Sequence, residues 1–91
     1  MLEQQVRLIN PLGLHARAAA KVVKCAAVFE SSVALTDLKK GTHADARSIL
    51  SLLALSAVAG TELLISVSGS DEEQAMETLV EMFRTGFGEL V

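Results

Sequence analysis

Residues 11–23, PLGLHARAAAKVV, contain the point at which the pattern of the chain changes from strand to helix. Pro11 fixes its own backbone angle and favours an extended residue before it, while Gly13 permits a tight bend. From Ala16 onward, apolar residues at positions 19, 22, 23 and 26 have the spacing of one helical face. The stretch therefore predicts a turn followed by a helix, with His15 immediately before the helix.

Alternating apolar and polar residues predict strands on both sides of this helix. Before it, Leu2, Val6 and Leu8 alternate with polar neighbours, which is typical of a strand with one wet face. After it, residues 33–36 and 42–44 predict two strands joined by a polar loop, and residues 62–67 predict a fourth. The outward-facing side chains would form the wet face of the sheet: Glu3, Gln5, Arg7, Glu62 and Ser66.

Two further helices are predicted downstream. Residues 48–55 are apolar on nearly every side, and Gly60 follows them. Residues 70–73, SDEE, are typical of a capping box with Ser70 as the N-cap and Glu73 at the third helical position. A third helix would then bury one stripe and end before the glycines at 86 and 88, the stripe being Ala75, Met76, Leu79, Val80 and Phe83.

The predicted element order is β-α-β-β-α-β-α, in one domain spanning residues 1–91. Two right-handed crossovers that share a central hairpin place the strands in the order 1-4-2-3, with antiparallel neighbours. The three helices would then cover one face of the four-stranded sheet. The expected fold class is α+β, an open-faced two-layer β-sandwich.

Composition narrows the classes of function. The net charge of −3 argues against a nucleic-acid partner, which usually meets a basic surface. One cysteine excludes an internal disulfide and suits a reducing compartment. The apolar stretch 49–58 is shorter than the roughly 18–20 residues of a membrane span, and residues 1–10 lack the pattern of a secretory signal. We expect a cytoplasmic protein with no membrane partner.

His15 lies where a helix exposes unpaired N–H groups and a partial positive charge. Such a site favours anions, phosphate above all, and Arg17 adds a guanidinium that can pair with phosphate oxygens. A neutral imidazole keeps a lone pair that can attack phosphorus, so these residues favour a phosphoryl acceptor. The simpler alternative is an ordinary capping or turn histidine. We expect no metal and no cofactor, because only His43 offers a second imidazole.

Two motifs give the chain a resemblance to a known family. GLHARAAAKVV at 13–23 and ARSILSLLALSAVAG at 46–60 resemble the HPr family, the histidine-containing phosphocarriers of the bacterial phosphoenolpyruvate-dependent phosphotransferase system. The resemblance extends from Val6 to Phe83. It implies that His15 accepts phosphate on Nδ1 from enzyme I and passes it to a IIA component of a sugar permease, with Arg17 stabilising the phosphate. The chain would be a carrier rather than a turnover enzyme.

The resemblance also assigns a regulatory role to Ser48, which in some bacteria a dedicated HPr serine kinase/phosphorylase modifies. A plain capping serine before the second helix is the alternative. This chain departs from the family in two places. Ala18 replaces a common proline, and the loop at 37–41 is slightly longer. Because alanine is a good helix former and the loop lies far from His15, we expect the site to survive both changes.

The second helix is too apolar for a helix with one buried side. We expect Leu52 and Leu55 in the core and an exposed remainder beside His15, where an apolar patch marks a docking surface. The predicted patch combines Ile49, Leu50 and Leu53 with two residues that the resemblance supports, Ala16 and Ala20.

Three other functions stay open. The chain could serve the nitrogen-regulatory branch of the same system, which these motifs do not distinguish from sugar transport. It could be a purely regulatory binder that acts through Ser48, although the pair of His15 and Arg17 argues against this. A Ser-His-Asp hydrolase is the remote option, because no nucleophile elbow is present.

Overall fold

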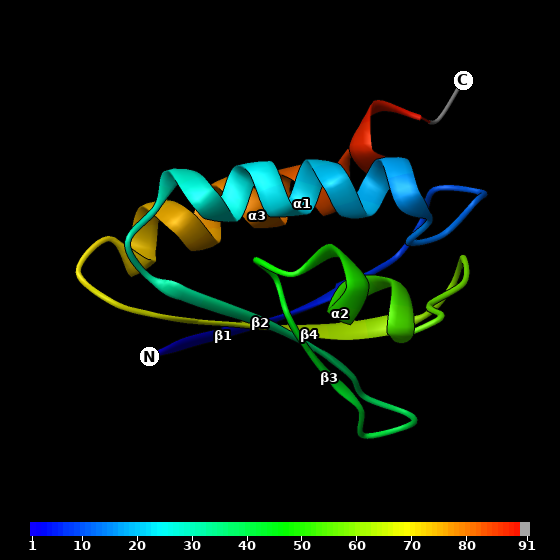
Figure 1. Ribbon diagram of the computed structural model, residues 1–91, viewed down its shortest axis with the longest axis horizontal. Helices are drawn as coiled ribbons and strands as arrows, with labels where there is room; N and C mark the ends of the chain where they lie inside the picture. The colour runs from blue at the N-terminus through cyan, green and yellow to red at the C-terminus, as the bar shows by residue number, and fades with distance from the viewer. Residues whose placement is uncertain (90–91) are drawn as a thin grey trace.

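The computed structural model describes residues 1–89 as a four-stranded sheet with helices packed on one face (Figure 1). The strands follow the order β1-β4-β2-β3, and all neighbours are antiparallel. The predicted open-faced sandwich is therefore confirmed. The elements in chain order are β1 (Leu2–Arg7), α1 (Ala16–Val28), β2 (Ser32–Asp37), β3 (His43–Asp45), α2 (Ile49–Ala54), β4 (Glu62–Ser68), α3 (Glu72–Arg84) and the 3₁₀ turn η1 (Gly86–Gly88).

The core lies between the inner face of the sheet and the helices. Leu63, Ile65 and Val67 of β4 are fully buried, as their alternation predicts. Leu35 of β2 pairs with Ile65, which continues the apolar face across the neighbouring strand. The helices cover this face with residues at helical spacing, all of them fully or almost fully buried: Ala18, Ala19, Val22, Ala26, Leu52, Ala75, Leu79 and Phe83.

The outer face of the sheet is polar, as predicted. Gln5 donates a hydrogen bond of 3.2 Å to the Glu62 carboxylate, and Arg7 lies 3.7 Å from the same group. Ser66 donates to Glu3 at 3.4 Å. Exposed contacts of this kind contribute little stability. This face is therefore polar, and the helices pack against the opposite, apolar face.

The predicted capping box of α3 is wrong. Asp71, and not Ser70, is the N-cap, and its side chain makes no capping hydrogen bond. The Asp71 carboxylate instead accepts from the backbone N–H groups of Glu30 and Ser31 and from the Ser31 hydroxyl. It thus ties the turn after α1 to the turn before α3. These hydrogen bonds, led by the one from the Ser31 hydroxyl, lower the pKa of Asp71.

A close backbone contact fixes the loop before α1. The Leu14 N–H donates to the Ala57 carbonyl at 2.9 Å, and Gly13 adopts a left-handed φ of +67°. A Cβ on Gly13 would lie 2.5 Å from the Ala57 oxygen and 2.9 Å from the Val58 Cα. Only glycine satisfies both the backbone angle and the contact. Gly13 therefore holds the loop in place two residues before His15.

Gly13→Ala should be more destabilising than Gly41→Ala, a matched control. Both glycines have left-handed φ values, +67° and +74°, but a Cβ on Gly41 meets no atom within 4 Å. The two variants share the cost of the backbone angle, so their difference isolates the clash, about 1–3 kcal/mol for forced overpacking. Urea unfolding measures both free energies. Equal losses would show that the loop moves away from Ala57 without cost.

Candidate functional site

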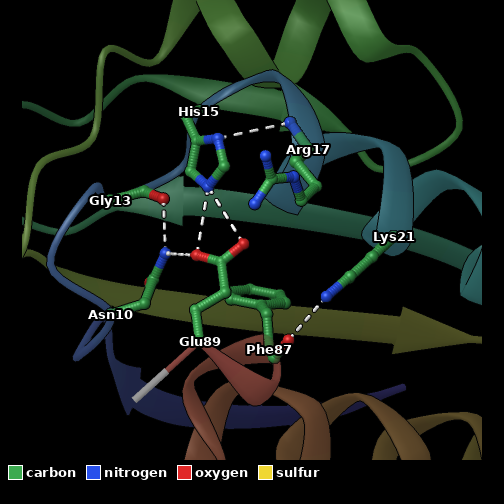
Figure 2. A network of polar contacts seen from close by, with 7 residues as sticks. All are labelled: Asn10, Gly13, His15, Arg17, Lys21, Phe87 and Glu89. Atoms are coloured by element: carbon green, nitrogen blue, oxygen red, sulfur yellow. Dashed lines mark hydrogen bonds and ion pairs between the residues drawn. The ribbon is translucent and has the colours of Figure 1, made fainter. Parts of the chain in front are cut away.

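His15 is the N-cap residue of α1. Its backbone is extended, with φ −80° and ψ 179°, and its carbonyl accepts the first helical hydrogen bond from the Ala19 N–H at 2.8 Å. The ring turns back over the helix end, and Nδ1 accepts from the Arg17 N–H at 3.3 Å (Figure 2). This length lies beyond the usual range for an N–H donor. The Nδ1 lone pair is therefore directed at the helix N-terminus and only weakly engaged there.

The other ring nitrogen faces a carboxylate from the far end of the chain. Nε2 of His15 lies 3.0 Å from Oε1 and 3.1 Å from Oε2 of Glu89 (Figure 2). An ionised carboxylate only accepts hydrogen bonds, so Nε2 carries the proton. The contact at Nδ1 agrees, because a nitrogen that accepts from the Arg17 N–H has a free lone pair. Both neighbours of the ring thus favour the same tautomer.

Asn10 holds the Glu89 carboxylate in place. The Asn10 side-chain amide is buried and donates to Glu89 Oε1 at 3.0 Å and to the Gly13 carbonyl at 2.7 Å. The hydrogen bond from His15 is the largest influence that lowers the pKa of Glu89, and that from Asn10 acts in the same direction. The carboxylate is therefore stabilised in its charged form where it contacts the ring.

The segment that carries Glu89 is anchored beside α1. Phe87 is buried and packs edge-on against Phe83, with ring centroids 4.9 Å apart. Its carbonyl accepts from Lys21 Nζ at 2.7 Å. Figure 1 shows this segment, in red, beside the blue beginning of α1. Residues near both ends of the described chain therefore meet at the histidine.

The Arg17 side chain is exposed and extends beside the His15 ring (Figure 2). None of the ion pairs between residues 1–89 includes Arg17. Its guanidinium is thus available to an incoming anion. Ala18, at the position of the family's proline, is fully buried inside the first turn of α1. The helix therefore begins at Ala16 without a proline, as expected.

Ser48 is the N-cap of α2, and its hydroxyl accepts from the Ser51 N–H at 3.2 Å. The capping interpretation of this serine is therefore confirmed, while its regulation stays a prediction. The hydroxyl belongs to a half-buried residue at the start of a six-residue helix. A charge added at Ser48 would stand next in sequence to the apolar side chains of α2.

The predicted docking residues lie on α1 and α2, which pack against each other. Leu50 is 77 % exposed and Ile49 is 39 % exposed, whereas Leu52 is fully buried. The remaining members differ in exposure, with Ala16 exposed and Leu53 and Ala20 half-buried. The helix thus divides its apolar residues between core and surface. That the surface part binds partners stays a prediction.

His43, the second histidine, lies on β3 and contacts Thr36 at 3.3 Å, away from His15 in the fold. Within residues 1–89, no three metal-ligating side chains of the histidine, cysteine or carboxylate kind gather at one place. No helix in the same range is both long enough and apolar enough to cross a membrane.

Comparison with known proteins decides the family. Residues 2–85 match the family described as the PTS HPr component phosphorylation site. The chain belongs to the HPr family. It is 40% identical to the phosphocarrier protein HPr of Xylella fastidiosa (strain Temecula1), over 98% of both chains. It is 34% identical to the phosphocarrier protein NPr of Escherichia coli K12, over 97% of both.

Solved structures of the HPr family share the fold. A crystal structure of HPr from Thermoanaerobacter tengcongensis superposes with a TM-score of 0.92, at 34% identity and over the whole of both chains. The family membership and the strand order thus agree. Membership of the HPr family also implies interaction with enzyme I and with IIA components of the phosphotransferase system.

Sequence reasoning missed Glu89, Asn10 and the anchoring role of Lys21. No motif or periodicity in the sequence marks Asn10 or Lys21 as part of the site. Glu89 lies 74 positions from His15, in a glycine-containing segment without periodicity. The one available signal was an acidic residue after buried aromatics, which does not point to a particular partner.

The contact between Glu89 and His15 should be lost in acid. Because the hydrogen bond from His15 lowers the pKa of Glu89, the contact stabilises the folded chain above the unfolded pKa, ordinarily about 4.3. That stability disappears as the pH falls through the lower folded pKa. The ¹³C shift of the Glu89 carboxyl, followed by NMR with and without concentrated urea, measures both values. A folded midpoint at or above the urea value would contradict the contact.

Proposed function

We propose that this chain carries a phosphoryl group on Nδ1 of His15 in the cytoplasm. It receives the group from phosphorylated enzyme I, which phosphoenolpyruvate charges, and delivers it to a IIA component of a sugar permease. One observation carries the proposal: the Nδ1 lone pair points at the N-terminus of α1 while Nε2 holds the proton. A nitrogen nucleophile is thereby placed where a phosphoryl group finds donors.

The electrostatics of the site support transfer in both directions. The Arg17 N–H, which is only weakly bound to Nδ1, and the Arg17 guanidinium lie beside the ring (Figure 2). The first turn of a helix also leaves N–H groups without partners inside the helix. They favour negative oxygen both on an incoming phosphoryl group and on the phosphorylated product. The ring is half-buried rather than enclosed, with 24% of its side chain exposed, so a partner can reach it.

The exposed apolar residues of α2 support transient docking. Leu50 projects from a short helix that packs against α1, the helix that His15 caps. An exposed apolar patch typically marks a protein-binding surface, and small interfaces release their partners readily. Such an interface suits a carrier, which must leave one partner before it binds the next.

Ser48 is the proposed site of regulation, through a serine kinase. A phosphate there would add about −1.5 to −2 charges at the start of α2. The helix end tolerates this charge, but the charge would stand close in sequence to Ile49 and Leu50, where a partner docks. Transfer would then weaken without damage to the fold. The capping position of Ser48 supports this proposal.

The nitrogen-regulatory branch is the second candidate, because the E. coli NPr is a relative over almost the whole chain. The higher identity to HPr proteins favours the sugar branch. Comparing the rates at which enzyme I of each branch phosphorylates the chain separates the two.

Phosphoenolpyruvate and enzyme I should place one acid-labile, base-stable phosphate on each chain. His15→Ala should abolish this phosphate, because it removes the nucleophile. His43→Ala, the matched control, should keep it. Arg17→Ala should be phosphorylated more slowly, since an oxygen contact is lost. Radiolabel retained after alkali measures all four chains, and label that persists in His15→Ala would identify a different acceptor.

Leu50→Glu should slow phosphoryl transfer at low partner concentration without unfolding the chain. A carboxylate on the docking surface opposes burial against a partner, at a cost of about 1–3 kcal/mol in binding. Val28→Glu is the control, because Val28 is also 77% exposed but lies at the opposite end of α1 from His15. Transfer rates against enzyme I concentration, with thermal unfolding, measure both effects. Equal rates in the two variants would place the docking surface elsewhere.

A further inference from the structure

The Glu89 carboxylate contacts Nε2 of the His15 ring, the nitrogen that does not bond to the phosphoryl group. We propose that Glu89 is a positioning residue for phosphoryl transfer, which keeps the proton on Nε2 and balances the charge that the ring acquires. The proposal rests on the function proposed above. It assigns a role to the segment after α3, which contains no recognisable motif.

The balance of the transfer step shows what Glu89 supplies. The Nδ1 lone pair forms a bond to phosphorus, and the bond between phosphorus and the phosphorylated donor protein breaks, with its electron pair left on the donor. The Nε2 proton stays in place, so the ring changes from neutral to positively charged. A carboxylate 3.0 Å from Nε2 stabilises that charge, as the aspartate does in a Ser-His-Asp triad.

Delivery to the next partner reverses these changes. A nucleophile of the acceptor protein bonds to phosphorus as the bond between Nδ1 and phosphorus breaks. The electron pair of the broken bond returns to the ring, which becomes neutral with the proton still on Nε2. Had the proton been on Nδ1 at the start, that nitrogen would have had no lone pair to offer. Glu89 therefore selects the reactive tautomer and leaves the carrier ready for another cycle.

The anchoring of Glu89 favours this role over simple attachment of the chain end. Phe87 and Lys21 already hold the segment, through a buried aromatic contact and a 2.7 Å hydrogen bond. Phe87 does so at a φ of +58°, which costs a non-glycine residue about 1–3 kcal/mol. The backbone thus adopts an unfavourable conformation two residues before Glu89. Backbone strain of this kind is typical of functional sites, where the position of a side chain matters.

Asn10 gives an independent indication. Its amide nitrogen joins the Glu89 carboxylate to the Gly13 carbonyl, yet its own oxygen is buried and accepts no hydrogen bond from residues 1–89. A buried acceptor without a partner costs about 1–3 kcal/mol. An apolar residue would avoid that cost. The donors of Asn10 therefore serve to aim the carboxylate at the ring, since its acceptor contributes nothing among the described residues.

Glu89→Gln tests the proposal, because it removes the charge and keeps the shape. Glu77→Gln, at an exposed position on α3, is the control with the same change in charge. With phosphorylated enzyme I as donor, Glu89→Gln should lower kcat by roughly 10–100-fold, the range for carboxylates that orient a metal-bound histidine in the same way. KM should stay unchanged, because the docking residues are intact. Steady-state transfer kinetics of both variants and the unaltered chain measure this split.

Nitrogen-15 NMR measures the shifts of the His15 ring nitrogens, which would not change if Glu89 only anchored its segment of the chain. In the unaltered chain at alkaline pH, Nδ1 should show the shift of a bare nitrogen and Nε2 that of a protonated one. In Glu89→Gln the two shifts should approach each other, because the amide can donate as well as accept. Unchanged ring shifts would overturn the selection of the tautomer.

The kinetic outcomes separate this inference from the proposed function. A kcat equal to that of Glu77→Gln, or a defect confined to KM, would overturn the role of Glu89 while the chain remains a carrier. Failure of the unaltered chain to accept phosphate on His15 would instead overturn the proposed function. A slow Glu89→Gln variant that still unfolds cooperatively and has altered ring shifts is the expected result.

Discussion

The contact of the Gly13 backbone with residues 57 and 58 is the constraint on which the site depends. It brings the loop before α1 against the loop before β4, closer than any side chain at residue 13 would allow. The Leu14 N–H closes the contact through Ala57. With the chain held close at this point, α1 begins at Ala16 and His15 occupies its N-cap.

Given that position, the chemistry of the ring follows from its two neighbours. The helix end offers N–H groups, so the nitrogen beside it accepts and keeps a lone pair. The carboxylate of Glu89 accepts only, so the nitrogen beside it must donate. Neither contact alone fixes the tautomer as firmly as both together. The reactive state of His15 therefore depends on two regions that are far apart in sequence and meet only in the folded chain.

The sequence predicted those parts of the fold that periodicity or local backbone geometry determines. Alternation identified Leu63, Ile65 and Val67 as the inner face of a strand, and crossover rules then gave the strand order. Helical spacing identified Val22 and Leu79 as core residues. His15 was found because its position before a helix has a meaning that depends on nearby residues alone.

The failures share a physical cause. At the start of α3, local sequence favoured Ser70 as the cap, but Asp71 became the N-cap and its carboxylate bonded to Glu30 and Ser31 in a distant turn. Glu89 reaches His15 across most of the chain by way of Phe87, whose left-handed backbone is unusual for a bulky residue. Long-range polar pairs leave no periodic trace. For the same reason the sheet topology follows from the sequence, whereas the pairing of Glu89 with His15 is evident only in the folded structure.

The residues that stabilise the fold and the residues available to anions and partners lie on different surfaces of the same helices. The buried face of α1 holds it to the sheet, while its first turn remains free for anions. In α2, Leu52 supplies the packing and Leu50 remains in solvent. Partner binding and ring chemistry can therefore change without disturbing the core. Glu89 is the exception that connects the two, because the contact between Phe87 and Phe83 anchors the segment that carries it. A loosened chain end would alter the ring before it unfolds the sheet.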